Sequence, residues 1–297
     1  MTKQNYLNSI EAANLLGVNV STIKRWTDSG KLNCIQTTGG HRKFLMKHIN
    51  EYLKNQPETG KNITVIPYDS SDHRQLNHLI QKHKINELYI HLLNNALKSN
   101  RENVNMIITG LALAQYPVHA MFDKLITPVL HKIGDMWEQK TLSVAEEHMA
   151  SDIIRDSILQ IREIIIRSES NSLKAFCFAL EDEQHDIALK MIQVILEQRG
   201  FDVFYSGQST PADSIEKLIS NYRPDRIYLS CTYYNEKWNK EQLEVKNYEL
   251  MTIFELAQKY NLDVYIGGEA FNHFKLKSKV VKRRLYTFEE IYNYEDM

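Results

Sequence analysis

Apolar residues recur every three to four positions through most of the first 170 residues, and after that they gather in short runs. The helical period predicts helices over 73–83, 85–99, 101–115, 118–138 and 143–167, which together form a four-helix bundle with a short lead-in helix. The short apolar runs predict strands at 173–180, 201–207, 226–230 and 263–268, separated by helices at 184–199, 210–222 and 242–260. This alternation indicates an α/β fold with a doubly wound parallel, Rossmann-like sheet, in which ligands bind beyond the carboxyl ends of the strands.

The first 55 residues carry start and stop signals for two short helices. Asn8 precedes an apolar repeat and Glu11 follows three residues later, which is the capping-box pattern of a helix start. Gly17 is a typical helix end, and Asn19 and Gly30 bracket a second helix in the same way. Two short helices joined by about three residues predict a helix-turn-helix.

The second of these helices separates an apolar face from a polar one. Ile23 and Trp26 lie one turn apart and are expected to face the core. The outward positions, which suit a DNA groove and its phosphates, are Ser21, Thr22, Lys24 and Arg25. A solvated helix face in any small helical domain would show the same pattern, so this helix alone does not decide the function.

The segment that follows favours DNA binding. The stretch KLNCIQTTGGHRKF alternates as a hairpin does, with Gly39 and Gly40 at its tight turn and a basic wing of His41, Arg42 and Lys43. A third helix follows, with Leu45, Ile49, Tyr52 and Leu53 on one side. Over about 45 residues this order resembles the MerR-type winged helix-turn-helix, and TTGGHRKF is similar to that family's wing signature. The resemblance implies double-stranded operator DNA as a partner and a homo-oligomer, because one short helix reads too few bases.

The length of the chain and the distribution of its charges both indicate several domains. The 297 residues predict a winged helix-turn-helix at 1–55, a linker at 56–72, a bundle at 73–170 and a sheet domain at 171–297. Residues 1–60 hold eight Lys and Arg against four Asp and Glu, whereas the rest of the chain carries a net charge of −5. A basic head on an acidic body is consistent with a polyanionic partner for the head.

The remaining compositional signals predict a cytoplasmic protein. Cys34, Cys177 and Cys231 lie far apart without metal-ligand spacing, and we interpret them as reduced thiols. The N-terminal residues lack the apolar core of a signal peptide, and no apolar stretch is long enough to span a membrane. We find no catalytic constellation, so the chain is not expected to be an enzyme.

One group of candidate ligand-binding residues lies in the bundle, within WEQKTLSVAEEHMAS. Ser143 and Glu146 form a capping box that fixes the start of the last helix. Val144, Glu147 and His148 then fall on one face, and Trp137 ends the preceding helix. Spacing alone would equally suit a buried indole above a surface Glu–His pair.

A second group lies at the predicted sheet edge. His185 directly follows the first strand, with Glu183 two residues earlier, while Ser230 ends the third strand and Gly267-Gly268 end the fourth. An imidazole at a strand end with a carboxylate beside it is typical of a metal ligand and the group that orients it. We therefore predict that His185 ligates a metal.

This second group resembles the Asp-x-His-x-x-Gly … Ser-x-Leu … Gly-Gly signature of cobalamin-binding domains, which implies that His185 is the lower axial ligand of cobalt. In that family the glycines permit close approach of the cofactor's tail. The chain departs from the signature: Glu183 stands for the aspartate, Ala188 for the glycine, and Ser230-Cys231-Thr232 for Ser-x-Leu. A degenerate domain that binds no cobalamin is the alternative.

The Trp-x9-Glu-His pattern of Trp137, Glu147 and His148 resembles the adenosyl pocket of cobalamin-dependent photoreceptor repressors. In domain order the whole chain resembles their CarH/LitR group of MerR-type regulators. This implies that adenosylcobalamin promotes, in the dark, an oligomer that binds operator DNA, and that light breaks the Co–C bond and dissociates the oligomer. The rival hypotheses are a corrinoid methyl-transfer protein and a regulator that acts through protein contacts or another ligand.

One departure concerns the illuminated state. In the best-known members of this group, the residue after the motif tryptophan is a histidine that ligates cobalt once the adenosyl group has gone. Glu138 occupies this position. A carboxylate competes poorly for such a site, so we predict an illuminated state with His185 as the single protein ligand.

Overall fold

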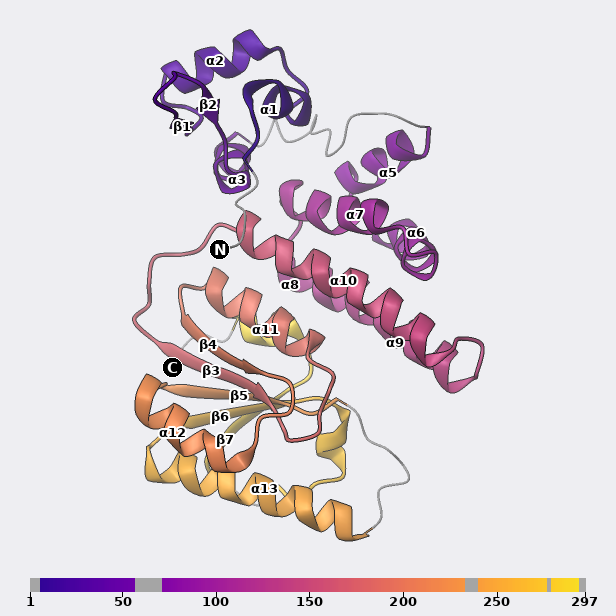
Figure 1. The fold of residues 1–297 in the computed structure, drawn as a ribbon, viewed down its shortest axis with the longest axis vertical. Helices are drawn as coiled ribbons and strands as arrows, with labels where there is room; N and C mark the ends of the chain where they lie inside the picture. Colours follow the sequence, from indigo (N-terminus) through magenta and orange to yellow (C-terminus); the bar gives the residue numbers. More distant parts are fainter. Residues whose placement is uncertain (1–5, 57–70, 233–239, 277–278, 294–297) are drawn as a thin grey trace. The chain divides into compact units, whose positions relative to one another are not determined.

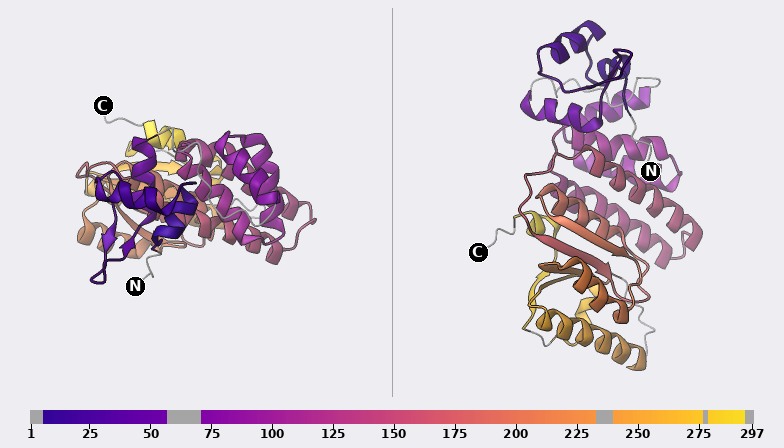
Figure 2. Two further views of the ribbon diagram at one scale, coloured as in Figure 1. Left: turned by 90° about the horizontal axis from the view of Figure 1, so that it is seen from above. Right: turned by 60° about the vertical axis from the view of Figure 1, so that its left-hand side comes forward.

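The computed structural model describes residues 6–56, 71–232, 240–276 and 279–293. The chain divides into two compact units, Met1–Ile166 and Arg167–Met297, which are described separately below (Figures 1 and 2). None of the described helices combines the length and apolar character needed to cross a membrane.

The N-terminal part of the first unit is a small winged head. It contains α1 (Ser9–Leu15), α2 (Val20–Asp28), the antiparallel strands β1 (Ile35–Gln36) and β2 (Arg42–Lys43), and α3 (Met46–Asn55). The predicted capping box is confirmed, because Asn8 accepts from the amides of Ile10 and Glu11 while Glu11 accepts from the Asn8 amide. Asn19 occupies the N-cap of α2 as predicted, but its side chain makes no cap hydrogen bond.

The head is built around residues that the apolar period predicts. Ile23, Ile49 and Leu53 are fully buried, and Trp26 packs on Tyr52 with 4.6 Å between ring centroids. Its core also includes Leu113 and Ile164 from the bundle.

The remainder of the first unit is helical. Its elements are α5 (Ser71–Gln81), α6 (Ile85–Leu97), α7 (Arg101–Leu113), α8 (Val118–Met121), a π-helical turn (Phe122–Ile126), α9 (Thr127–Glu138) and α10 (Val144–Ile164). The sequence period predicts one continuous helix over 118–138, whereas the structure inserts the π turn in it. Pro128, at the start of α9, explains the difference, because its ring lacks an N–H and would clash with a carbonyl one turn earlier.

The second unit is a five-stranded parallel sheet with the order β4-β3-β5-β6-β7. Its elements are β3 (Lys174–Ala179), α11 (Ile187–Gln198), β4 (Asp202–Gly207), α12 (Ala212–Tyr222), β5 (Arg226–Ser230), α13 (Lys240–Lys259), β6 (Asp263–Gly267), a 3-10 turn (Glu269–Asn272), β7 (Val281–Leu285) and α14 (Phe288–Asn293). β7 and α14 were not predicted from the sequence. The VKRRL segment carries three consecutive basic residues, which hide the apolar signal of this edge strand.

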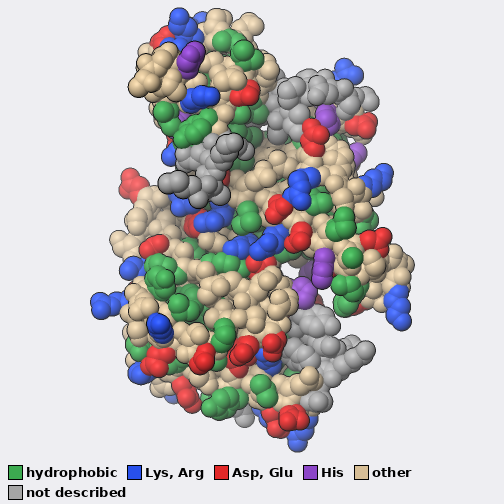
Figure 3. All heavy atoms as spheres, in the orientation of Figure 1, with side chains coloured by type: hydrophobic (Ala, Val, Ile, Leu, Met, Phe, Trp, Pro, Cys, Tyr) green, Lys and Arg blue, Asp and Glu red, His purple; other side chains and the backbone are tan. Residues whose placement is uncertain are grey.

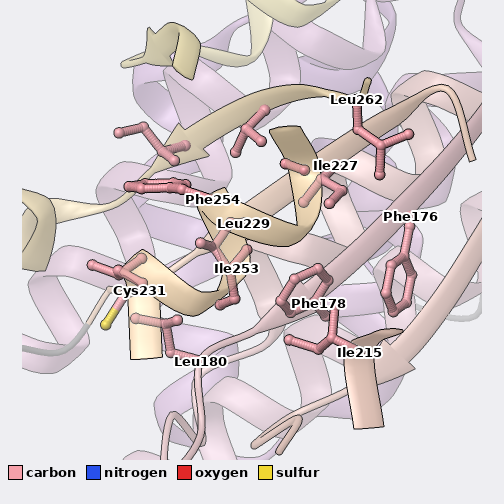
Figure 4. Packing of buried hydrophobic residues seen from close by; sticks show 14 of the residues in the cluster. Phe176, Phe178, Leu180, Ile215, Ile227, Leu229, Cys231, Ile253, Phe254 and Leu262 are labelled. Carbon is pink, nitrogen blue, oxygen red and sulfur yellow. The ribbon is translucent and has the colours of Figure 1, made fainter. Parts of the chain in front are cut away.

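Side chains alternate across the sheet. Phe176, Phe178 and Leu180 point into the core beneath α12 and α13, together with Ile253 and Phe254 of α13 (Figure 4). The alternate residues of β3 face the opposite side, which α11 covers (Figures 1 and 2). Both faces are therefore buried, and the carboxyl edge of the strands carries the loops available for function.

Candidate functional site

The strand order locates a switch point between β3 and β5. The chain leaves β3 toward β4 on one side, whereas the strands after β5 are added on the other side. Ligands of open parallel sheets bind in the crevice that this reversal creates at the carboxyl edge. The segment 180–186 after β3 and the residues after Ser230 border this point.

His185 and Glu183 meet at this edge as the sequence predicts. Oε1 of Glu183 accepts hydrogen bonds from the backbone N–H of His185 at 2.8 Å and from its ring Nδ1 at 2.7 Å. A carboxylate can only accept, so Nδ1 carries a proton, and in the neutral imidazole Nε2 then carries the lone pair. The Glu183 side chain is 3% exposed and the His185 side chain 53% exposed. The carboxylate is thus buried support, and the imidazole is presented to a ligand.

Glu183 also joins the two loops across the switch point. Its Oε2 accepts from the backbone N–H of Thr232 at 2.8 Å. Burial, followed by the nearby Glu183 charge and its hydrogen bond, raises the pKa of the Cys231 thiol, which therefore stays protonated and donates to Glu183. Ser230 is buried and in register with Ala179 and Gly267.

The two glycines at the end of β6 differ in how much room their surroundings leave for a side chain. Gly268 has φ of +109°, and a Cβ there would lie 2.2 Å from the carbonyl oxygen of Cys231. A Cβ at Gly267 would make only ordinary contacts, the nearest at 3.5 Å. The sequence predicts that both glycines make room for a cofactor's tail. The structure gives another reason for Gly268, because a side chain there would clash with the Cys231 backbone. Ala188 lies half-buried in the first turn of α11.

Two residues of α13 that hold this edge were not predicted from the sequence. Lys246 and Glu249 are 8% and 4% exposed, and they form an ion pair of 3.2 Å. Glu249 accepts from the backbone N–H of Glu181 at 2.7 Å, and Lys246 donates to the Glu181 carbonyl oxygen. A signal was present, because Lys246 lies four residues before the core residue Leu250 and three before Glu249, on one side of the helix.

The bundle group is assembled more loosely. The capping box of Ser143 and Glu146 is confirmed and starts α10 at Val144. Glu147 accepts from the Ser151 hydroxyl at 2.7 Å and lies 3.6 Å from Nε2 of His148, whose side chain is 68% exposed.

The other two residues of the bundle group are less embedded than a core position. Val144 is 51% exposed. Trp137 is partly buried near the end of α9, and its carbonyl accepts from the Lys140 amide in the turn toward α10. The Ser151–Glu147 hydrogen bond lies within α10, whereas the Lys140–Trp137 hydrogen bond lies at the end of α9.

The head presents its predicted DNA-binding residues unequally. Ser21, Lys24, Arg25 and His41 are exposed, whereas Thr22, Arg42 and Lys43 are partly buried. Arg42 forms an ion pair of 2.6 Å with Asp28, the last residue of α2, and thereby ties the wing to the second helix. On the face shown in Figure 3, basic and acidic side chains are interspersed.

Two protein families match parts of the chain. The helix-turn-helix domain family matches residues 6–57, which include the winged head. A B12 binding domain family matches residues 86–161, which cover most of the helical part from α6 to α10.

The chain is similar to two repressors of Myxococcus xanthus. It is 28% identical to the HTH-type transcriptional repressor CarH over 158 residues, 53% of this chain and 50% of CarH. It is 27% identical to the HTH-type transcriptional repressor CarA over 113 residues, 38% of this chain and 37% of CarA. The similarity thus spans half or less of the length of these relatives.

Among solved structures, the monomethylamine corrinoid protein of Methanosarcina barkeri resembles the chain with a TM-score of 0.52 and 12% identity, covering 68% of this chain and 93% of that one. At this identity the likeness concerns the fold alone. The chain thus combines a match to a helix-turn-helix domain family with a match to a B12 binding domain family, and part of it is similar in sequence to CarH.

Proposed function

We propose that the chain is a DNA-binding transcriptional repressor whose assembly and operator binding are controlled by adenosylcobalamin and light. The observation that carries the proposal is the His185–Glu183 pair at the switch point. The donor set fits a cobalt corrinoid, because a neutral imidazole with its second nitrogen fixed by a carboxylate is a strong transition-metal ligand. His185 would be the lower axial ligand and Glu183 its orienting group.

The bound cofactor would supply a photolabile Co–C bond, and the chain's own residues do the rest. Glu183 sets the tautomer of His185 and holds its ring plane. Ser230, Gly267 and Gly268 line the strand ends beside this pair.

We assign the bundle residues to the adenosyl group. Trp137 offers a flat apolar surface for the adenine, Val144 adds an aliphatic contact, and Glu147 and His148 can hydrogen-bond to ribose or adenine. Contacts made only to the adenosyl form would shift the chain toward an assembled state, because a ligand moves such an equilibrium by its differential affinity.

In the head, Ser21, Thr22, Lys24 and Arg25 of α2 are the proposed groove and phosphate contacts, and His41, Arg42 and Lys43 are those of the wing. A homo-oligomer, a dimer or a tetramer, would place two such heads on a symmetric operator. The CarH and CarA similarity and the helix-turn-helix match support this role. We propose a cytoplasmic location, where such DNA is found.

The decisive experiment is to load the full chain with adenosylcobalamin in the dark, and then to illuminate it. Visible spectra, oligomer size and DNA retention are recorded before and after light. We expect an imidazole-ligated spectrum, an oligomer and operator binding in the dark, and loss of the last two in light. A chain that binds DNA equally with and without the cofactor would instead be a regulator acting through protein contacts or another ligand.

DNA contacts are tested separately in the dark complex. Lys24→Ala and Arg25→Ala should each weaken operator binding by about 1–3 kcal/mol and lower its salt dependence. Arg42→Ala should also release the wing from Asp28, so Asp28→Ala serves as its control. Unchanged affinity and salt dependence in the Lys24, Arg25 and Arg42 variants would place DNA binding elsewhere.

A further inference from the structure

We infer that Lys246 and Glu249 are positioning residues that hold the His185 loop in its ligating geometry before any ligand is bound. The inference rests on the proposed function, because it concerns how the proposed cobalt ligand is presented. The contacts that carry the inference are those of the pair with the loop that separates β3 from α11.

The pair forms hydrogen bonds with both backbone groups of Glu181, the second residue after β3. Oε1 of Glu249 accepts from the Glu181 N–H at 2.7 Å, and Nζ of Lys246 donates to the Glu181 carbonyl oxygen. The same Nζ lies 3.2 Å from Glu249 and 3.5 Å from the Asp182 carboxylate. One helix thereby fixes the position and the orientation of the peptide units that lead into Glu183.

The loop is held on its opposite side by the segment after β4. The Asp182 N–H donates to the Ser209 hydroxyl at 2.9 Å, and the Ser209 N–H donates to the Glu183 carbonyl at 3.0 Å. Asp182 has a positive φ of 63°, a conformation that a non-glycine residue keeps only when its surroundings impose it. With contacts on both sides of the turn, Glu183 is directed at His185 and Thr232.

Energetics point to positioning rather than to stability. Burying an ion pair costs more desolvation free energy than a hydrophobic pair of similar volume, and such pairs are often replaceable without loss of stability. Burial indeed raises the pKa of Glu249 despite the opposing effects of the Glu181 amide and Lys246. An apolar pair would pack equally well on α13, but it could not hold both backbone groups of Glu181.

The first test uses the full chain without cofactor. The double variant Lys246→Met/Glu249→Leu removes both charges together, so neither is left buried alone. Its control is Lys259→Ala/Glu216→Ala, which deletes an exposed 2.6 Å pair at the other end of α13. We expect thermal midpoints within about 4 °C of the parent for both variants. We expect the amide of His185, which bonds to Glu183 and not to the pair, to exchange at least tenfold faster in the Met/Leu variant alone.

Nuclear magnetic resonance of the His185 ring gives a second readout without cofactor. The parent and the control should show a single Nδ1–H tautomer, and the Met/Leu variant a mixture. If the Met/Leu variant folds with parental His185 exchange and tautomer, the inference is wrong. If it does not fold, Lys246→Met, which removes the donor to the Glu181 carbonyl and leaves Glu249 able to take up a proton, must still accelerate exchange at His185, and parental exchange there overturns the inference.

Cobalamin then separates this inference from the proposed function. The nitrogen hyperfine coupling of the cobalt(II) complex reports whether an imidazole is coordinated. If the parent and His185→Ala give the same coupling, the proposed function fails, whatever the Met/Leu variant does. If the parental coupling depends on His185, the Met/Leu variant should bind at least tenfold more weakly with partial coupling, and parental binding with full coupling would refute the positioning role.

Discussion

The two groups of residues proposed to contact the cofactor, one in each unit, contrast in how far the protein builds them on its own. At the sheet edge, a carboxylate that is 3% exposed holds an imidazole at 2.7 Å, with further hydrogen bonds on both sides of the loop. On the bundle, the carboxylate of Glu147 is 20% exposed and the imidazole of His148 lies 3.6 Å away, beyond a good hydrogen bond.

The contrast separates two tasks. A lower ligand must be in place for every form of the cofactor, so rigidity at His185 reduces the ordering cost of binding. A surface that distinguishes the adenosyl form from others must respond to it, and side chains with few fixed partners can do so. The sheet edge is therefore expected to govern affinity, and the bundle face to govern discrimination.

The largest effect is expected from His185→Ala. Removing the only proposed protein ligand should weaken cobalamin binding by at least about 100-fold and abolish the imidazole-ligated spectrum, because even indirect supporting groups cost 10–100-fold. His148→Ala is the matched control on the bundle and should change affinity by less than about tenfold. Binding with an unaltered spectrum in His185→Ala would remove the lower-ligand assignment.

Glu183→Gln should have the next largest effect, about 10–100-fold on affinity. The amide keeps an oxygen that accepts from either His185 or Thr232, but its NH₂ group cannot accept from the other. The His185 tautomer is then no longer fixed. Titration with cobalamin measures the loss of affinity in Glu183→Gln, and the same titration of Glu147→Gln on the bundle gives the comparison. Equal losses in the two variants would contradict the difference drawn between the two regions.

The sheet edge was largely predictable from sequence, and the reason is topological. Parallel strands place their following residues at one edge, so His185, Ser230 and Gly268 had to lie along the same edge once the strands were identified. The sequence could not show which contact makes each residue necessary at its position. Gly268 is required by the Cys231 carbonyl, and Thr232, a departure from the signature, donates its backbone N–H to Glu183.

Other features escaped because they depend on contacts distant in sequence. The Lys246–Glu249 pair and Glu181 lie about 65 residues apart in the chain and meet only through the packing of α13 on the sheet. The π turn and β7 were missed for local reasons, a proline inside a helical period and basic residues on an edge strand. The capping boxes were predictable because each is complete within four residues.

Trp137→Ala should act on discrimination more than on affinity. Loss of the indole removes the flat surface proposed for adenine, so the preference for adenosylcobalamin over methylcobalamin should fall by about tenfold, equivalent to ~1.4 kcal/mol. The His185-dependent spectrum should persist. Oligomer size measured with both cofactors shows whether assembly has been uncoupled from binding. A variant that still assembles only with the adenosyl form would mean that the pocket lies elsewhere.

The smallest effect in the dark is expected from Glu138→His. Glu138 is exposed at the last position of α9. The substitution should therefore leave the stability of the fold unchanged and the affinity for the cofactor in the dark within about twofold of the parent. Its consequence should appear only after illumination, when an imidazole at this position could coordinate cobalt and a carboxylate competes poorly. His131 cannot take over this role, because it lies seven residues earlier on the same helix, about 10.5 Å along the axis. The parent should therefore reload with fresh adenosylcobalamin in the dark and recover its oligomer, whereas Glu138→His should show a stable bis-imidazole spectrum and reload slowly. A bis-imidazole spectrum already present in the illuminated parent would show that the bundle, through His148 or another residue, supplies a second ligand and is less adaptable than its exposed side chains indicate.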